Sequence, residues 1–155
     1  ELYNRRKLED VLESEMARFH RHRQVYSVVL LDLDYFKQVN DTYGHQVGDH
    51  TLIETASILL KNTRKIDYVG RWGGEEFLLI LTGTSLTGAT VIAEKLCNII
   101  NRHDFQPIKQ LSASFGVAQC QADEPLAKLI KRVDTALYKA KSEGRNRVSV
   151  SQVSQ

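Results

Sequence analysis

The residue types and spacing best suited to chemistry lie in residues 71–77, where two glycines precede two glutamates. Apolar, β-branched segments on either side predict two strands joined by a tight hairpin. Glycine tolerates positive φ, so we expect Gly73 and Gly74 to form the turn and to leave no Cβ in the path of a ligand. The carboxylates of Glu75 and Glu76 would then suit a phosphate chain and its Mg²⁺, because Mg²⁺ prefers oxygen ligands.

A hairpin alone is weak support, since Gly-Gly turns are common and paired glutamates often only add solubility. A second acidic pair, Asp32 and Asp34, ends the apolar segment 26–33, which we predict to be a central strand buried on both faces. Carboxylates at the end of a buried strand are costly unless a partner such as a metal ion compensates them. We therefore expect the two acidic segments to converge on one metal site, with a strand-end cap as the alternative role of Asp32.

Composition limits the class of protein. The chain has 155 residues and a net charge of +2, which fits one domain over residues 1–155 and gives no indication of a nucleic acid polymer as partner. Cys97 and Cys120 match no metal or redox spacing and are expected to be reduced core thiols. We find no signal peptide or membrane-spanning run. Because the chain begins inside a predicted helix, we expect a cytoplasmic domain of a longer protein, which leaves open a membrane anchor elsewhere.

Hydrophobic periodicity predicts alternating helices and strands. A short helix after residue 34 is expected to lead into a structured turn over residues 42–49, and Thr51 and Glu54 have the spacing of a capping box for the next helix. The full expected order is an opening helix over 1–23, a strand over 26–33, two helices, the hairpin, a helix near 89–100, a strand over 110–120, a helix from 123 to Gly144, a strand over 147–150 and a frayed tail over 151–155. This order indicates an α+β fold with a mixed, mainly antiparallel sheet and helices on its faces.

With both acidic segments in view, the sequence resembles the GGDEF family of diguanylate cyclase catalytic domains. Residues 73–77, Gly-Gly-Glu-Glu-Phe, match the family signature in its glutamate variant. Segments 4–6, 32–37, 40–41, 44–49, 114–117 and 134–146 resemble further family motifs, so the similarity covers nearly the whole chain. The resemblance implies a nucleotidyl-cyclase, ferredoxin-like palm with a βααββαβαβ core. It also implies condensation of two GTP molecules into cyclic di-GMP with release of two pyrophosphates.

The resemblance implies a metal site formed by Asp32, the Leu33 carbonyl and the pair Glu75 and Glu76. Two Mg²⁺ or Mn²⁺ ions per active site would stabilise the attacking and leaving oxygens. Glu75 is the expected base for the 3′-hydroxyl, either directly or through the metal.

The implied substrate contacts come from several segments. Asn40 and Asp49 are expected to bind the guanine edge, although Asn40 could simply be a helix end and Asp49 an N-cap. His45 would line the nucleotide or brace the turn. Lys141 and Arg145, two cations near a helix end, could simply interact favourably with the helix macrodipole. The expected contacts are the N–H groups of Tyr35, Phe36 and Lys37 for phosphate, Asn40 and Asp49 for the guanine edge, His45, Gly73 and Gly74 at the nucleotide, and Lys141 and Arg145 for the terminal phosphates.

An Arg-x-x-Asp pattern at Arg64 and Asp67 matches the inhibitory site of the family, with Lys95 a weaker candidate for the same surface. The resemblance therefore implies feedback inhibition by cyclic di-GMP. The expected partners are GTP, the product, a second copy of the domain and an upstream sensor or regulatory domain. Two alternatives stay open, namely a non-catalytic cyclic di-GMP receptor and an interaction domain on the same fold.

Overall fold

The computed structural model describes residues 2–152, and its elements follow the predicted order. No helix within that range combines the length and the apolar character needed to cross a bilayer. The elements are α1 (Arg5–His22), β1 (Tyr26–Leu33), α2 (Phe36–Tyr43), α3 (His45–Lys61), β2 (Tyr68–Arg71), β3 (Glu76–Thr82), α4 (Leu86–Arg102), β4 (Ala113–Gln119), α5 (Leu126–Ser142) and β5 (Val148–Val150).

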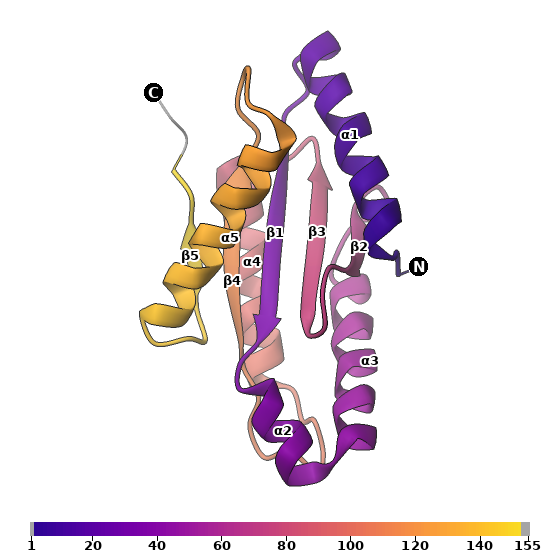
Figure 1. Ribbon diagram of the computed structural model, residues 1–155, viewed down its shortest axis with the longest axis vertical. Coiled ribbons are helices and arrows are strands. Elements are labelled where there is room, and N and C mark those ends of the chain that lie inside the picture. The colour runs from indigo at the N-terminus through magenta and orange to yellow at the C-terminus, as the bar shows by residue number, and fades with distance from the viewer. Residues whose placement is uncertain (1, 153–155) are drawn as a thin grey trace.

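The five strands form one sheet in the order β2-β3-β1-β4-β5 (Figure 1). Only the β4–β5 pair is parallel, and the other three pairs are antiparallel. The prediction of a mixed, mainly antiparallel sheet is therefore confirmed. β1 lies in the middle of the sheet, and all eight of its residues are buried, as expected for a central strand covered on both faces.

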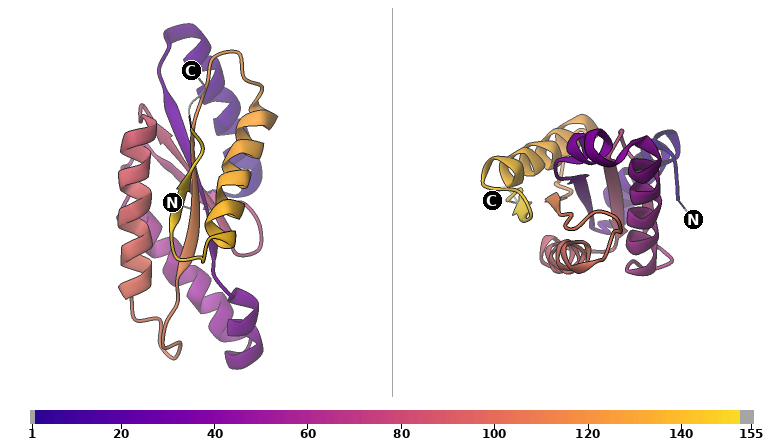
Figure 2. Two further views of the ribbon diagram at one scale, coloured as in Figure 1. Left: turned by 90° about the vertical axis from the view of Figure 1, so that its left-hand side faces the viewer. Right: turned by 90° about the horizontal axis from the view of Figure 1, so that it is seen from below.

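Helices cover both faces of the sheet (Figure 2). Apolar side chains of α1 and α5 pack with alternate residues of β1 and β3, including Val28 and Leu30, on one face. Side chains of α3 and α4 pack with the intervening residues, including Val29 and Leu31, on the other. Because strand side chains alternate between faces, these two cores fix the register of β1, and with it the position of the acids at its end. Cys97 and Cys120 are both buried free thiols, one in each core.

The start of α3 differs from the prediction. α2 and α3 are separated only by Gly44, whose φ of 91° suits glycine, so the expected turn over 42–49 is wrong. The predicted capping box is also wrong: Thr51 lies inside α3, where its hydroxyl donates to the Val47 carbonyl at 2.8 Å. The alternative of Asp49 as an N-cap fails for the same reason, since Asp49 lies in the second turn of α3.

The end of the chain is partly anchored, which corrects the expectation of a frayed tail from residue 151. The Ser151 N–H donates to the Val117 carbonyl at 2.8 Å, and Arg132 donates to the Ser151 hydroxyl at 3.0 Å. The rest of the predicted tail, residues 153–155, lies outside the described residues.

Candidate active site

The sheet brings the two predicted acidic segments together at one end. In the antiparallel β1–β3 ladder Asp32 is the register partner of Glu76, the first residue of β3. The Leu33 N–H donates to the Glu75 carbonyl at 3.4 Å, which attaches the hairpin to the end of β1. Carboxylates more than forty residues apart in sequence thus become neighbours because two buried strands pair in a single register.

The hairpin between β2 and β3 forms without the predicted glycine conformation. Neither Gly73 nor Gly74 has positive φ, so the expectation that they supply a left-handed turn is wrong. Space explains them better: a Cβ on Gly73 would lie 2.9 Å from a carboxylate oxygen of Glu76, whereas Gly74 faces open space. The Gly74 side of the turn thus leaves a ligand unobstructed access, as the sequence predicted.

The base of the hairpin is held by α1. Arg5 donates to the Trp72 carbonyl at 3.1 Å, and its guanidinium lies 4.1 Å from the centre of the buried Trp72 ring. The sequence did not predict this cation–π contact, because it joins residues 67 positions apart. The available signal was Trp72 itself, a large aromatic residue between Gly70 and Gly73.

Like charges crowd the edge of the sheet that carries Asp32, Glu75 and Glu76, which we call the acidic end. Asp32 is only 6% exposed; one carboxylate oxygen accepts from the Lys141 ammonium, and the other, Oδ1, is buried without a partner. Burial raises the pKa of Asp32, while Lys141 opposes that rise and Glu75 adds to it. Burial and the charge of Asp32 likewise raise the pKa of Glu76. Two like charges facing each other in a sheet are destabilising, so this end favours an added cation.

These residues fit a Mg²⁺ ion that is completed by substrate. No three His, Cys, Asp or Glu side chains within residues 2–152 are grouped so as to hold a metal ion by themselves. The unpartnered Asp32 oxygen, the nearby Glu76 carboxylate and the backbone at Leu33 and Glu75 provide hard oxygen donors. Mg²⁺ is typically held by one or two carboxylates plus substrate phosphates and water, so an incomplete protein cage suits it.

Asp34, in contrast, is fully occupied by protein. Its carboxylate accepts from the hydroxyls of Ser112 and Ser114, each at 2.6 Å, and from the Asn146 N–H at 3.0 Å. Arg145 approaches the same carboxylate at 4.0 Å. Asp34 therefore fastens the segment after α5 to the end of β1 and needs no metal, a role that the sequence analysis did not find.

The segment after Asp34 presents an uncapped helix start. Tyr35 adopts a left-handed conformation with φ of 56°, and no side chain caps the N-terminus of α2. The N–H groups of Tyr35, Phe36 and Lys37 are therefore available to an anion at the positive end of the helix dipole. The Arg145 guanidinium lies 4.7 Å from the centre of the Tyr35 ring, which brings a second cation to this end besides Lys141.

The residues predicted to bind guanine lie on α2 and α3. Asn40 packs tightly against Gly48: a Cβ on Gly48 would stand 1.8 Å from the Asn40 amide oxygen. Asp49 is exposed and lines an open, largely apolar cleft of about 650 Å³ together with Leu52 and Ile53. An apolar cleft with one carboxylate suits a flat base that carries N–H donors.

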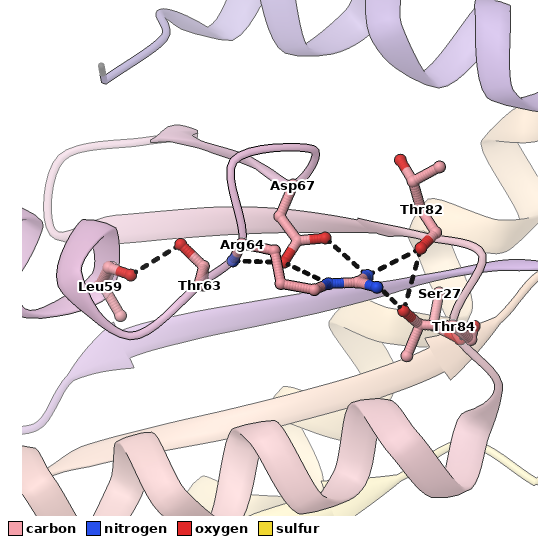
Figure 3. Close-up of polar contacts among 7 residues, drawn as sticks. All are labelled: Ser27, Leu59, Thr63, Arg64, Asp67, Thr82 and Thr84. Carbon is pink, nitrogen blue, oxygen red and sulfur yellow. Dashed lines mark hydrogen bonds and ion pairs between the residues drawn. The ribbon is translucent and has the colours of Figure 1, made fainter.

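The predicted inhibitory pair lies near Thr82, at the end of β3 away from Glu76. Arg64 and Asp67 form an ion pair with each other (Figure 3). Arg64 donates to both carboxylate oxygens of Asp67, at 3.2 and 2.8 Å, and to the Thr82 carbonyl at 2.8 Å. The two residues also line a hollow of about 170 Å³ on the surface. The remaining predicted residues, Lys37, His45 and Lys95, are exposed on α2, α3 and α4, and the structure does not test their roles.

The helices, the mixed sheet and the acidic hairpin define a nucleotidyl-cyclase-like palm. A family model described as "Diguanylate cyclase, GGDEF domain" matches residues 1–147. The chain belongs to the GGDEF domain family.

Three similar proteins place the chain within that family. Diguanylate cyclase DgcM of Escherichia coli K12 is 42% identical over 147 residues, covering 95% of this chain, which spans only 36% of that relative's length. The active GGEEF domain of a diguanylate cyclase from Vibrio cholerae is 35% identical with a TM-score of 0.93, covering 99% of this chain and 100% of that one. The GGDEF domain of DgcB from Caulobacter crescentus, solved in complex with c-di-GMP, is 28% identical with a TM-score of 0.92, covering 98% and 90%.

Proposed function

We propose that residues 1–155 of this chain form the catalytic domain of a diguanylate cyclase, within a longer protein, and that the domain condenses two GTP molecules into cyclic di-GMP. The observation that supports this most is the pairing of Asp32 with Glu76 around an unpartnered buried oxygen, next to an uncapped helix start. Acids that favour a cation and N–H groups that favour an anion lie side by side, which suits a metal-bound triphosphate.

The triphosphate would bind between α2 and the segment after α5. The N–H groups of Tyr35, Phe36 and Lys37 would hold the β- and γ-phosphates, and Lys141 and Arg145 would contact the terminal oxygens. Lys141 is bound to Asp32 in the ligand-free chain. A metal ion held by Asp32 would supply the positive charge that Lys141 now provides, so the Lys141 ammonium would be free to contact the phosphates.

Guanine would lie against the cleft beside α3. The Asp49 carboxylate would accept from guanine N1 and N2, and the Asn40 amide would donate to an acceptor on the base. Adenine lacks the N2 donors and would leave these groups unpaired, so discrimination against ATP is expected to be large. His45, Gly73 and Gly74 would complete the walls around the nucleotide.

Chemistry requires the 3′-hydroxyl of each GTP to attack the α-phosphate of the other in line. Each 3′-oxygen forms a bond to phosphorus, each α–β bridging oxygen leaves with pyrophosphate, and Glu75 accepts the hydroxyl proton. Two Mg²⁺ or Mn²⁺ ions held by Asp32, the Leu33 carbonyl, Glu75 and Glu76 would neutralise charge on the attacking and leaving oxygens. Burial raises the pKa of Glu76, and a bound cation would oppose that rise.

One domain offers one nucleotide site, so two copies must face each other around a two-fold axis. We expect an upstream regulatory domain to control that encounter. Product would bind at Arg64 and Asp67, with Lys95 contributing from α4, and would reduce activity. The DgcB complex with c-di-GMP supports binding of this dinucleotide within the family.

The test is an assay of the domain tethered to a dimeric coiled coil, with GTP and Mg²⁺, in which cyclic di-GMP is measured by chromatography. We expect product from the native sequence and none from Glu75→Gln, with thermal unfolding unchanged in that variant. Glu13→Gln, at an exposed glutamate of α1, is the matched control and should retain activity. Binding of cyclic di-GMP without any turnover would identify a receptor instead. The absence of both binding and turnover would identify an interaction domain.

A further inference from the structure

Arg64 covers the carboxylate that the product is expected to use. Asp67 accepts from the Arg64 backbone N–H at 2.9 Å and from two guanidinium nitrogens, and its side chain is completely inaccessible to solvent. The Arg64 side chain is 49% exposed and lies over it. A ligand can therefore contact the Asp67 carboxylate only after the ion pair between Arg64 and Asp67 has opened.

Two further residues, Thr82 and Thr84, hold Arg64 in this closed position (Figure 3). Guanidinium Nη2 donates to the Thr84 hydroxyl at 2.7 Å and to the Thr82 carbonyl at 2.8 Å. The Thr84 hydroxyl in turn donates to the Thr82 carbonyl at 3.1 Å. Nη2 therefore lies within hydrogen-bonding distance of three acceptors, including Asp67, and together they fix the direction of the guanidinium plane.

Thr84 itself is rigidly held. It is 9% exposed, and its carbonyl accepts from the Ser27 hydroxyl of β1 at 2.8 Å in a buried contact. The loop between β3 and α4 is thereby fastened to the central strand. The Thr84 hydroxyl is thus a fixed acceptor, in contrast to an exposed side chain that could follow Arg64 as it moves.

We propose that Thr84 is a positioning residue that keeps Arg64 closed over Asp67 and so sets the affinity of the inhibitory site for cyclic di-GMP. The inference rests on the proposed product binding at Arg64 and Asp67. We call the closed arrangement of Arg64 over Asp67, with its bonds to Thr82 and Thr84, the clamp. In a two-state picture the apparent dissociation constant equals the intrinsic dissociation constant divided by the fraction of open molecules, so a weaker clamp gives tighter binding. A residue that contacts no ligand would then determine the product concentration at which inhibition begins.

The test compares Thr84→Val with Thr84→Ser by calorimetric titration of cyclic di-GMP into the 155-residue chain. Valine keeps the shape and removes the hydroxyl, so we expect binding roughly fivefold tighter, the order expected for losing one hydrogen bond to a half-exposed cation. Serine keeps the hydroxyl and should bind like the native chain. Arg64→Ala should not bind.

A second readout follows the clamp without ligand. The Arg64 Nε–H, identified by NMR from its loss in Arg64→Lys, should exchange with solvent faster in Thr84→Val than in Thr84→Ser. Equal affinity and equal exchange in native and Thr84→Val chains would overturn the inference and leave the inhibitory site intact. Weaker binding by Thr84→Val would also overturn it, since Thr84 would then be a ligand contact. Faster exchange with no binding by any form would support the clamp and refute the inhibitory site.

Discussion

Replacement of Lys141 by methionine tests the electrostatics of the acidic end most directly. Methionine keeps much of the side-chain volume and removes the ammonium that bonds one oxygen of Asp32, whose other oxygen already lacks a partner. The carboxylate is left buried with no opposite charge that the structure provides. We therefore expect Lys141→Met to destabilise the ligand-free chain.

The size of the effect follows from burial. Removing one partner of a fully buried pair costs about 3–5 kcal/mol, whereas an exposed pair contributes about 0–1 kcal/mol. The Asp32 side chain is 9% exposed and that of Lys141 is 28% exposed, so this pair lies between the two cases. We expect a loss of about 2 kcal/mol in the free energy of unfolding at pH 8.

The loss should depend on pH. Burial raises the pKa of Asp32 above its ordinary value of 3.8, and Lys141 opposes that rise. Without Lys141 the folded-state pKa rises further, so the folded chain binds this proton more tightly than the unfolded chain does. Stability is then lost as pH rises from the unfolded value through the folded value. The deficit of Lys141→Met should therefore be small near pH 4 and complete at pH 8.

Urea denaturation at several pH values measures this deficit, with Lys139→Met as the matched control. Lys139 is exposed in the same last turn of α5, so its loss reports the helix-dipole contribution alone. In an Asp32→Asn background the cost of Lys141→Met should nearly vanish. A cost that is the same in that background, or that does not change with pH, would refute the reasoning.

Three further predictions concern the nucleotide site and the core. Gly48→Ala should displace the Asn40 amide, because the new Cβ would lie 1.8 Å from its oxygen; we expect the KM for GTP to rise roughly tenfold in initial-rate assays, with little change in stability. Asp49→Asn should reduce the preference for GTP over ATP at least roughly tenfold, and an unchanged ratio would remove Asp49 from base recognition. Gly116→Ala should lose about 3 kcal/mol of stability, because a Cβ would meet backbone atoms of α5 at 2.4 and 2.5 Å, whereas Gly74→Ala, which faces open space, should unfold like the native chain.

Much of the fold could be predicted because hydrophobic periodicity is a local signal. The β1 segment is apolar throughout, and the α4 and α5 stripes recur at helical spacing, so the order of elements and the mixed sheet followed. The acids at the strand ends were also found from local pattern. Their meeting depended on one assumption, that the two strands pair, and the register of Asp32 with Glu76 bears it out.

The errors arose where tertiary contacts decide local structure. Thr51 and Glu54 have the spacing of a cap, yet the helix begins six residues earlier, because Gly44 alone makes the turn between α2 and α3. The enclosure of Asp34 by Ser112 and Ser114 depends on a strand nearly eighty residues away. Long-range hydrogen bonds of this kind leave no periodic trace in a single sequence.

The two strands that carry Asp32 and Glu76 also reach Ser27 and Thr82, near the clamp on Arg64. Glu76 and Thr82 are six residues apart in an extended strand, so the acids and the clamp are separated by roughly 20 Å. A dinucleotide bound at Arg64 and Asp67 therefore cannot block a triphosphate bound near Asp32 and Glu76 of the same chain. If cyclic di-GMP binds at Arg64 and Asp67 as proposed, we expect inhibition to be noncompetitive towards GTP, with maximal velocity falling while KM holds.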